Sequence, residues 1–331
     1  MNVTEKLKKV QEDQKSYICL GLDLDPKKIP SEYNGSLKSI FDFANRIIDA
    51  TSDLVCAYKP NMAFFESLGT EGFSLLKLII ERVPDNIPVI LDGKRNDIGN
   101  TASHYARSAF EILGVSWVTI NPYMGYDSIR PFLEYKDSGV FILCLTSNSG
   151  AKDFQMLKVD GKPIYQIVAE KVDFWNKEAN CGLVVGATQP DELLAVRSIA
   201  KDMPILIPGV GAQGGSLEMA VKNGTANFTK PAVINVSRSV LYASNGPDFA
   251  QRARAELQKL NDTVMFIKTG KPQKDGMPLP PKTLPGETEA AKTTETSETI
   301  PNQNSNDDIT EIQDNPPTQE TTDKPDDLSG A

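Results

Sequence analysis

The segment Val89-Ile-Leu-Asp-Gly-Lys-Arg-Asn-Asp-Ile-Gly-Asn-Thr101 changes abruptly from apolar to charged. Its apolar, partly β-branched beginning is typical of a buried parallel strand. Asp92, Lys94 and Asp97 follow where that strand would leave the core, and Asp92 and Lys94 would point to the same side of an extended backbone. Such a group indicates either a functional site or an exposed loop with an incidental ion pair, which is worth only about 0–1 kcal/mol. The rest of the chain decides between these interpretations.

Apolar runs typical of strands alternate with segments of helical spacing along the chain. We expect strands at 17–23, 54–59, 87–92, 117–121, 140–145, 183–185, 205–207 and 233–236, and helices at 37–50, 66–82, 100–113, 127–135, 163–177, 189–200, 216–223 and 247–260. Successive β-then-α units imply a parallel sheet with helical crossovers. We therefore predict an α/β fold, a (β/α)8 TIM barrel. An open doubly wound sheet would more often show a glycine-rich dinucleotide turn after its first strand, which this chain lacks.

The composition changes near Thr269, after which Thr, Glu, Asp, Pro, Asn and Gln predominate and large apolar residues are rare. Such a segment buries too little apolar surface to offset its chain entropy. We predict a barrel domain at residues 1–265 and a disordered, acidic, low-complexity tail at 266–331. Much of the formal net charge of −9 then belongs to the tail.

Cysteine placement and the absence of targeting patterns indicate the compartment. The four cysteines lie in or beside expected strands, as buried reduced thiols would: Cys19, Cys56, Cys144 and Cys181. The single histidine, His104, excludes a His-rich metal cluster. We find no signal region, no apolar run long enough to span a bilayer and no basic stripe for nucleic acid. These features predict a cytoplasmic protein that binds neither membrane nor nucleic acid.

Polar or glycine-bearing groups end nearly every expected strand: Asp23, Lys59, Asp92 with Lys94 and Asp97, 146–148, 186–188, 208–215 and 237–239. In a barrel the carboxyl ends of the strands meet on one face, where the chemistry takes place. Loops after the seventh and eighth strands commonly bind phosphate. In this chain the loop after the seventh strand has closely spaced glycines that let backbone N–H groups approach an anion. The loop after the eighth strand offers the Arg238 guanidinium. The pattern favours a phosphate-bearing substrate.

Five motifs in order give the chain a resemblance to orotidine 5′-phosphate decarboxylases: Gly21-Leu-Asp23, Ala57-Tyr-Lys59-Pro, Asp92-Gly-Lys-Arg-Asn-Asp97, Pro208-Gly-Val-Gly-Ala-Gln213 and Ser237-Arg238-Ser. The resemblance covers about residues 1–265. The loop 145–150, Leu-Thr-Ser-Asn-Ser-Gly, resembles that of the bacterial long-loop branch, type 2. This resemblance implies decarboxylation of orotidine 5′-phosphate to uridine 5′-phosphate, the last step of UMP biosynthesis, without metal or organic cofactor.

The resemblance also implies a role for each site residue. A charged array comprises Lys59, Asp92, Lys94 and Asp97, in which Lys94 stabilises and protonates a C6 carbanion. Asp97 and Thr101 are implied to reach the neighbouring subunit's site in a homodimer. The implied substrate contacts are Asp23 and Lys59 for ribose, Ser147 for the pyrimidine, and Gly211, Gln213 and Arg238 for phosphate. If the loop aligns differently, Asn148 or Ser149 takes the place of Ser147.

Other functions share part of this pattern. Sugar-phosphate decarboxylases and aldolase-like synthases of the same suprafamily carry a D-x-K-x-x-D strand end but need Mg²⁺ to stabilise an enediolate. A non-catalytic phosphate-binding barrel, or an assembly in which the acidic tail is the active portion, is a different class of alternative. Retention of all four charged residues argues against an inactive barrel.

Overall fold

Eight parallel strands close into a barrel in the computed structural model, which describes residues 1–33, 35–211 and 214–271. The strands are β1 (Ile18–Leu22), β2 (Ala57–Pro60), β3 (Ile90–Arg95), β4 (Trp117–Ile120), β5 (Gly139–Leu145), β8 (Cys181–Val185), β9 (Ile205–Ile207) and β10 (Ala232–Val236). They pair in the order β2-β1-β10-β9-β8-β5-β4-β3, and isolated parallel bridges between Tyr58 and Val89 and between Asn61 and Asp92 join the two ends. The predicted TIM barrel is therefore confirmed.

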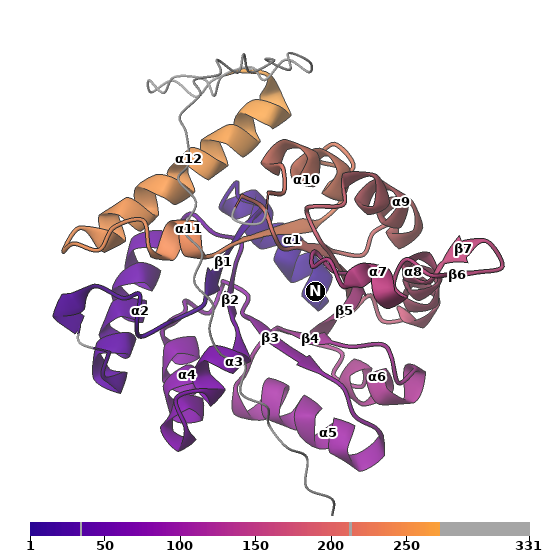
Figure 1. Cartoon of the computed structure of the whole chain (residues 1–331), viewed down its shortest axis with the longest axis horizontal. Helices are drawn as coiled ribbons and strands as arrows, with labels where there is room; N and C mark the ends of the chain where they lie inside the picture. The colour runs from indigo at the N-terminus through magenta and orange to yellow at the C-terminus, as the bar shows by residue number, and fades with distance from the viewer. Residues whose placement is uncertain (34, 212–213, 272–331) are drawn as a thin grey trace, which may run out of the picture. The chain divides into compact units, whose positions relative to one another are not determined.

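Helices surround the strands, as Figure 1 shows. They are α1 (Val3–Asp13), α2 (Leu37–Thr51), α3 (Met62–Glu66), α4 (Thr70–Arg82), α5 (Gly99–Arg107), α6 (Tyr126–Leu133), α7 (Ala151–Phe154), α8 (Ile164–Trp175), α9 (Pro190–Ala200), α10 (Leu217–Gly224), α11 (Arg238–Leu241) and α12 (Phe249–Thr269). A 3-10 turn, Ser31–Tyr33, a π-helix, Ser108–Ile112, and a small hairpin of β6 (Lys158–Val159) and β7 (Lys162–Pro163) complete the described part. None of these helices is long and apolar enough to cross a membrane.

Three expected helices differ from the observed ones, and the one expected at 100–113 is α-helical only to Arg107 and continues as the π-helix Ser108–Ile112. The helix expected at 66–82 begins only at Thr70, because the chain turns at Gly69, whose φ of +78° lies in the left-handed region that suits glycine. The last helix continues to Thr269, past the predicted domain boundary at 265, since Val264 and Ile267 still pack on the core and Gly270 caps the helix in a left-handed conformation. The remainder of the predicted tail, from residue 272, lies outside the described residues.

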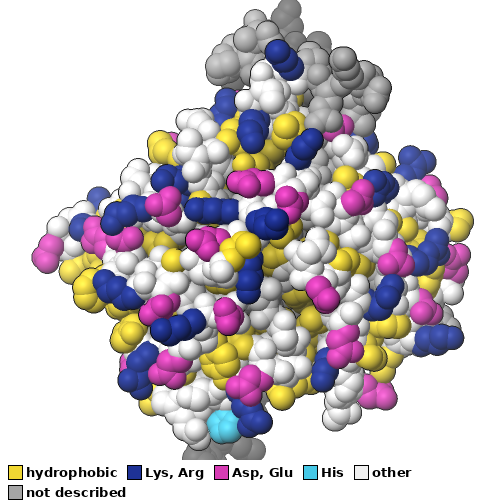
Figure 2. Space-filling model, turned by 180° about the vertical axis from the view of Figure 1, so that it is seen from behind, with side chains coloured by type: hydrophobic (Ala, Val, Ile, Leu, Met, Phe, Trp, Pro, Cys, Tyr) yellow, Lys and Arg dark blue, Asp and Glu magenta, His cyan; other side chains and the backbone are white. Residues whose placement is uncertain are grey.

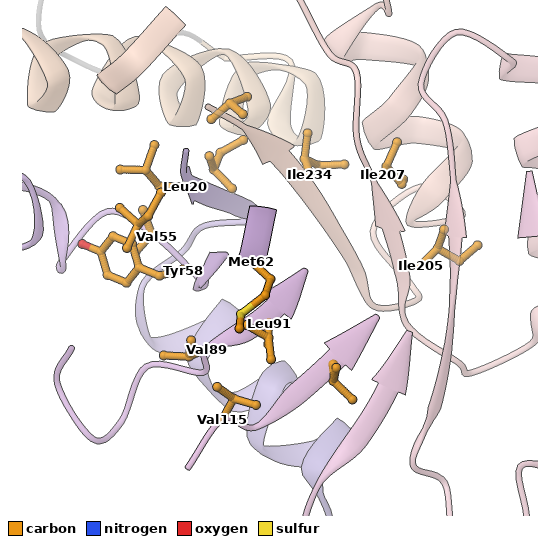
Figure 3. Packing of buried hydrophobic residues seen from close by; sticks show 14 of the residues in the cluster. Leu20, Val55, Tyr58, Met62, Val89, Leu91, Val115, Ile205, Ile207 and Ile234 are labelled. Carbon is orange, nitrogen blue, oxygen red and sulfur yellow. The ribbon is translucent and has the colours of Figure 1, made fainter. Parts of the chain in front are cut away.

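The strands pack on two sides, as a closed parallel barrel requires. One set of side chains faces the helices, including Leu20, Tyr58, Leu91 and Ile234, which Figure 3 shows with their neighbours. The alternate set fills the barrel: Cys19, Ala57, Ile90, Trp117, Phe141, Val184, Leu206 and Val233. Val3 and Leu7 of α1 belong to this second cluster. Helix α1 therefore closes the amino-terminal end of the barrel.

Packing at the closed end is tight around Trp117. Its ring lies 4.6 Å from that of Phe141, centroid to centroid, and it pairs across the sheet with Gly139. A Cβ on Gly139 would lie 2.3 Å from the Trp117 ring. Only glycine fits there without displacement of the indole.

We expect Gly139→Ala to lower the free energy of unfolding by about 1–3 kcal/mol, because the added methyl group overpacks a filled interior. Urea denaturation measures the change. Gly246→Ala is the matched control, since its nearest neighbours are flexible side chains at 3.3 Å or more and its φ is not in the left-handed region. Equal stabilities for the two variants would show that the barrel interior is less tightly filled than described.

Candidate active site

The carboxyl ends of the strands surround a pocket of about 450 Å³. Two positions beyond the apolar interior layer, the same face of the strands carries polar groups that line it: Lys59 on β2, Asp92 on β3, Thr119 on β4 and Asn235 on β10. Six residues expected from the sequence line this pocket: Asp23, Lys59, Asp92, Lys94, Ser147 and Arg238. The barrel thus changes from apolar to charged along its own axis.

Asp92 is the centre of the charged group. Its Oδ2 accepts a hydrogen bond from Lys59 Nζ at 2.8 Å, and its Oδ1 accepts one from Lys94 Nζ at 2.6 Å. The side chains of Lys59 and Asp92 are only 5% and 11% exposed, whereas that of Lys94 is 50% exposed toward the pocket opening. The Lys59 ammonium is therefore buried against the carboxylate, and the Lys94 ammonium remains accessible to a ligand.

The two buried groups keep each other charged. Burial alone would lower the pKa of Lys59, but the negative charges of Asp92 and Asp23 and the hydrogen bond to Asp92 outweigh it and hold that pKa above its ordinary value. Burial would also raise the pKa of Asp92, yet the ammonium groups of Lys59 and Lys94 bring it well below its ordinary value. At neutral pH the site contains a carboxylate with two cations on it.

Lys94 has an unusual backbone. Its φ is +44°, a left-handed conformation that side-chain-bearing residues rarely adopt and that costs on the order of 1–3 kcal/mol. The pairing of β3 with β4 shifts register between Leu91 and Arg95, which places Lys94 in a bulge. Sequence analysis placed Asp92 and Lys94 on one side of a regular strand. The structure brings their side chains together, but through this bulge.

The end of the pocket near β1 and β10 offers oxygen acceptors. Ser237 Oγ donates to Asp23 Oδ2 at 2.5 Å, and Tyr242 donates to the Asp23 carbonyl at 2.7 Å. Asp23 Oδ1 and Asn235 Oδ1 are buried and have no hydrogen-bond partner among the described residues. Both are suited to accept hydroxyl or N–H donors of a ligand.

The expected phosphate contacts are placed in part. Arg238 begins α11 at the pocket, and within the described ranges its guanidinium takes part in no ion pair. Gly209 lines the pocket, whereas Gly211 donates its backbone N–H to the Gly215 carbonyl at 3.0 Å and is not among the lining residues. Gln213 lies outside the described residues. This end of the site has one guanidinium and a glycine-rich loop beside it.

The loop after β5 brings to the pocket two of the three residues that could contact a pyrimidine. Ser147 and Asn148 line the pocket, and Ser149 does not. A Cβ on Gly186 would lie 2.8 Å from both the backbone and the side chain of Ser147, so a side chain at 186 would push the loop away. Asn148 is held by Thr146, whose hydroxyl lies 2.7 Å from Asn148 Oδ1.

Two expected site residues lie away from this pocket. Asp97 and Thr101 do not line it, and Asp97 Oδ1 accepts the backbone N–H of Ile98 at 2.8 Å. Ile98 is itself 52% exposed, and Thr101 is exposed in the first turn of α5. Both residues therefore lie outside the lining of this chain's own pocket.

Sequence reasoning assigned no role to three polar lining residues, Asn61, Thr119 and Asn235, and included Ser237 only in the strand-end motif with Arg238. Thr119 and Asn235 lie inside strands, whereas the site residues expected from the sequence follow strand ends. Counting by twos from the buried residues Trp117 and Val233 would have found both, since alternate residues share a face.

Features elsewhere agree with a buried, reduced core. All four cysteines are buried and free, as expected, and burial raises the pKa of Cys56 to about 12.

The part of the chain that the structure describes contains no group of three or more His, Cys, Asp or Glu side chains that could hold a metal ion. On the face drawn in Figure 2, Lys and Arg side chains are interspersed with Asp and Glu rather than gathered into one basic patch.

Comparisons with known proteins agree with one another. A family model described as "Orotidine 5'-phosphate decarboxylase / HUMPS family" matches residues 16–254. An orotidine 5′-phosphate decarboxylase of Ralstonia pickettii is 49% identical over 267 residues, which cover 80% of this chain and 98% of the relative. One from Dehalococcoides mccartyi is 46% identical over 268 residues, 80% of this chain and 97% of the relative.

Solved structures give the same result. The OMP decarboxylase of Leishmania donovani is 38% identical, with a TM-score of 0.69, and the match covers 79% of this chain and 99% of that one. The UMP synthase of the same organism is 40% identical, with a TM-score of 0.72, over 80% of this chain and 56% of that one. The chain therefore spans about half the length of the second protein.

The Lys59–Asp92 pair predicts a specific pH dependence of stability. In the wild type the raised pKa of Lys59 means that its contribution is present at neutral pH and is lost as the pH rises through that pKa. In Asp92→Asn the lysine stays buried without its main counter-charge, so its folded-state pKa falls below the unfolded value. We expect a loss of about 3–5 kcal/mol at pH 7 that shrinks toward pH 10, because the unfolded chain then binds more protons than the folded one.

Urea denaturation at several pH values measures this difference. Asp97→Asn is the control, because Asp97 forms no ion pair within the described part of the chain and its substitution should change stability by no more than about 0.5 kcal/mol. A loss in Asp92→Asn that is independent of pH would contradict the pairing.

Proposed function

The chain belongs to the orotidine 5′-phosphate decarboxylase / HUMPS family, and from that membership we propose how its residues carry out the reaction. The reaction is the decarboxylation of orotidine 5′-phosphate to uridine 5′-phosphate, which completes UMP biosynthesis, and the enzyme is a carboxy-lyase. The observation that carries the assignment of roles is Asp92 with an ammonium group on each carboxylate oxygen, at 2.8 and 2.6 Å. This group lies in the pocket at the carboxyl ends of the strands.

Lys94 is the proton donor in this proposal. Breaking the bond between C6 and the carboxylate leaves CO₂ and an electron pair on C6, with no carbonyl placed to delocalise it. A fixed positive charge stabilises that carbanion electrostatically. The Lys94 ammonium, the more exposed of the two cations, then gives a proton to C6, which forms the C–H bond of the product and leaves a neutral amine.

Asp92 and Lys59 hold the donor in place. Lys59, buried on the far side of the carboxylate, fixes Asp92, and Asp92 in turn holds the Lys94 ammonium at 2.6 Å. A substrate carboxylate above Asp92 would be repelled by it, and the repulsion ends as CO₂ leaves. This ground-state contribution is secondary to the electrostatic stabilisation of the carbanion.

Groups remote from C6 supply binding energy that holds this unfavourable arrangement. Asp23 and Lys59 bind the ribose hydroxyls, and Ser147 contacts the pyrimidine. Arg238, with the loop that contains Gly211 and Gln213, binds the phosphate. The Gly211 N–H is used within its loop in this structure, so its phosphate contact requires a change of that loop. None of these steps uses a metal ion or an organic cofactor.

We also propose a homodimer with shared sites. Asp97 and Thr101 do not line their own pocket, Ile98 between them is exposed, and large apolar side chains are also exposed after β4: Tyr123, Met124 and Tyr126. Helix α5, which follows β3, packs against helix α6, which follows β4. A second copy on this surface would bury the apolar side chains and receive Asp97 and Thr101 at its own site.

Three further assignments complete the proposal. The long connection from β5 to β8, which contains α7, the hairpin and α8, supports the type 2 branch. The buried free cysteines support a cytoplasmic, reducing location. Relatives that align over nearly their whole length with 80% of this chain support a decarboxylase domain that is complete without the tail.

We expect the wild type to decarboxylate orotidine 5′-phosphate in the presence of EDTA, and Lys94→Ala to lose at least about 10³-fold in kcat, because it lacks both the proton donor and the charge beside the carbanion. The ultraviolet change at decarboxylation measures the rate. Lys9→Ala, which removes an exposed lysine at the opposite end of the barrel, should behave as the wild type. Activity that EDTA abolishes, or that appears only on a sugar phosphate with Mg²⁺, would overturn the assignment.

Subunit mixing tests the shared site. Lys94→Ala and Asp97→Ala are each expected to be inactive alone, whereas a mixture that exchanges subunits should regain about a quarter of wild-type activity, since half of the dimers are mixed and each contains one intact site. Sedimentation or light scattering establishes the dimer, and differently tagged copies establish exchange. Exchange without any rescue would show that Asp97 does not act across subunits.

A further inference from the structure

The bulge in β3 creates an opening that one side chain of β4 fills. Leu91 pairs with Val118 and Arg95 pairs with Ile120, so the residues from Asp92 to Lys94 stand opposite Thr119 alone. A regular ladder would bond the Lys94 N–H to the neighbouring backbone, and the bulge removes that partner. The left-handed turn at Lys94, with its φ of +44°, therefore needs another acceptor to hold it.

Thr119 supplies this acceptor. Its Oγ1 accepts the Lys94 backbone N–H at 2.9 Å, and the same hydroxyl lies 3.0 Å from Asp92 Oδ1. A hydroxyl has a single hydrogen, and a carboxylate can only accept, so the Thr119 hydrogen is directed to Asp92. The residue is 1% exposed, lies two positions after the packed Trp117 on the same face of β4, and has little freedom to turn.

The same hydroxyl thus connects the backbone of one functional residue to the side chain of the other. Asp92 Oδ1 receives both the Thr119 hydroxyl and the Lys94 ammonium, the latter at 2.6 Å. A ring of contacts results: Lys94 N–H to Thr119, Thr119 to Asp92, and Asp92 to Lys94 Nζ. The backbone N–H and the side-chain ammonium of Lys94 are thus both fixed relative to the Asp92 carboxylate.

We propose that Thr119 is a positioning residue of the decarboxylation: its hydroxyl fixes the bulge that aims the Lys94 ammonium. The proposal rests on the proposed function, because it concerns the aim of the same proton donor. Thr119 does not transfer a proton and acts only through Lys94 and Asp92. Without the hydroxyl the left-handed turn loses its bond, and the ammonium samples positions away from C6. A displacement of about 1 Å can cost a factor of 10² in rate.

Thr119→Val and Thr119→Ser form a matched pair. Valine keeps the shape and β-branching of threonine without the hydroxyl, and serine keeps the hydroxyl without the methyl group. We expect Thr119→Val to lower kcat by about 10²-fold while KM changes by less than about threefold, because the phosphate contacts lie after β9 and β10 and because Asp92 keeps its bond to Lys59. Thr119→Ser should restore kcat to within a few-fold of the wild type.

Titration with uridine 5′-phosphate by calorimetry counts the binding-competent sites, so that kcat is expressed per intact site even where part of a variant is unfolded. Thr119→Ala, which also lacks the hydroxyl, is measured in the same way and should match Thr119→Val. A wild-type kcat per site in Thr119→Val would overturn the proposal, and so would equal losses in the valine and serine variants. A rise in KM at unchanged kcat would assign Thr119 to substrate binding instead and likewise overturn it.

The wild type and Lys94→Ala, assayed alongside, separate the two levels of inference. A wild type that does not decarboxylate orotidine 5′-phosphate contradicts the proposed function itself. An active wild type with an equally active Thr119→Val contradicts only the role of Thr119.

Discussion

The structure depends on one carboxylate that is held between two ammonium groups. Asp92 is almost fully buried, and a lone charge in that position would be strongly disfavoured. Lys59 offsets its charge from within the barrel, and Lys94 does so from the side of the pocket. The buried charges of Asp92 and Lys59 are tolerable only because each has an opposite charge beside it, whereas Lys94 remains half exposed. The rest of the barrel supplies the rigid strands that keep the three within hydrogen-bond distance.

The barrel provides this rigidity by dividing its interior along the axis. Large apolar side chains, centred on Trp117 and Phe141, fill the amino-terminal half, and helix α1 closes it. The carboxyl-terminal half presents polar side chains at the next inward-facing positions of the same strands. Because one continuous strand carries both kinds of residue, displacement of the apolar layer would move the charged layer with it. Packing far from the substrate therefore determines the precision of the site.

The eight strands, most of the helices and six of the pocket residues could be predicted from the sequence, because strand periodicity and the chemistry of strand ends are local signals. The bulge at Lys94 could not, since it depends on how β3 pairs with β4 rather than on either strand alone. Thr119 was missed for the same reason: in the sequence it is one polar residue inside an apolar strand. Helix α12 runs past the expected end because composition alone does not reveal that Ile267 still packs on the core.

The pairing of β1 with β10 has a consequence for the folding of the enzyme. The hydrogen bond from Ser237 to Asp23 joins residues 214 positions apart, at the place where the first and last strands of the ring meet. Contacts of such long range form late, because the entropy of closing so large a loop has to be overcome first. Asp23, the acceptor proposed for the ribose, therefore gains its Ser237 partner only when the ring closes. A nascent or partly folded chain, however much of its sheet is present, has no complete site, and catalysis begins only when the barrel is whole.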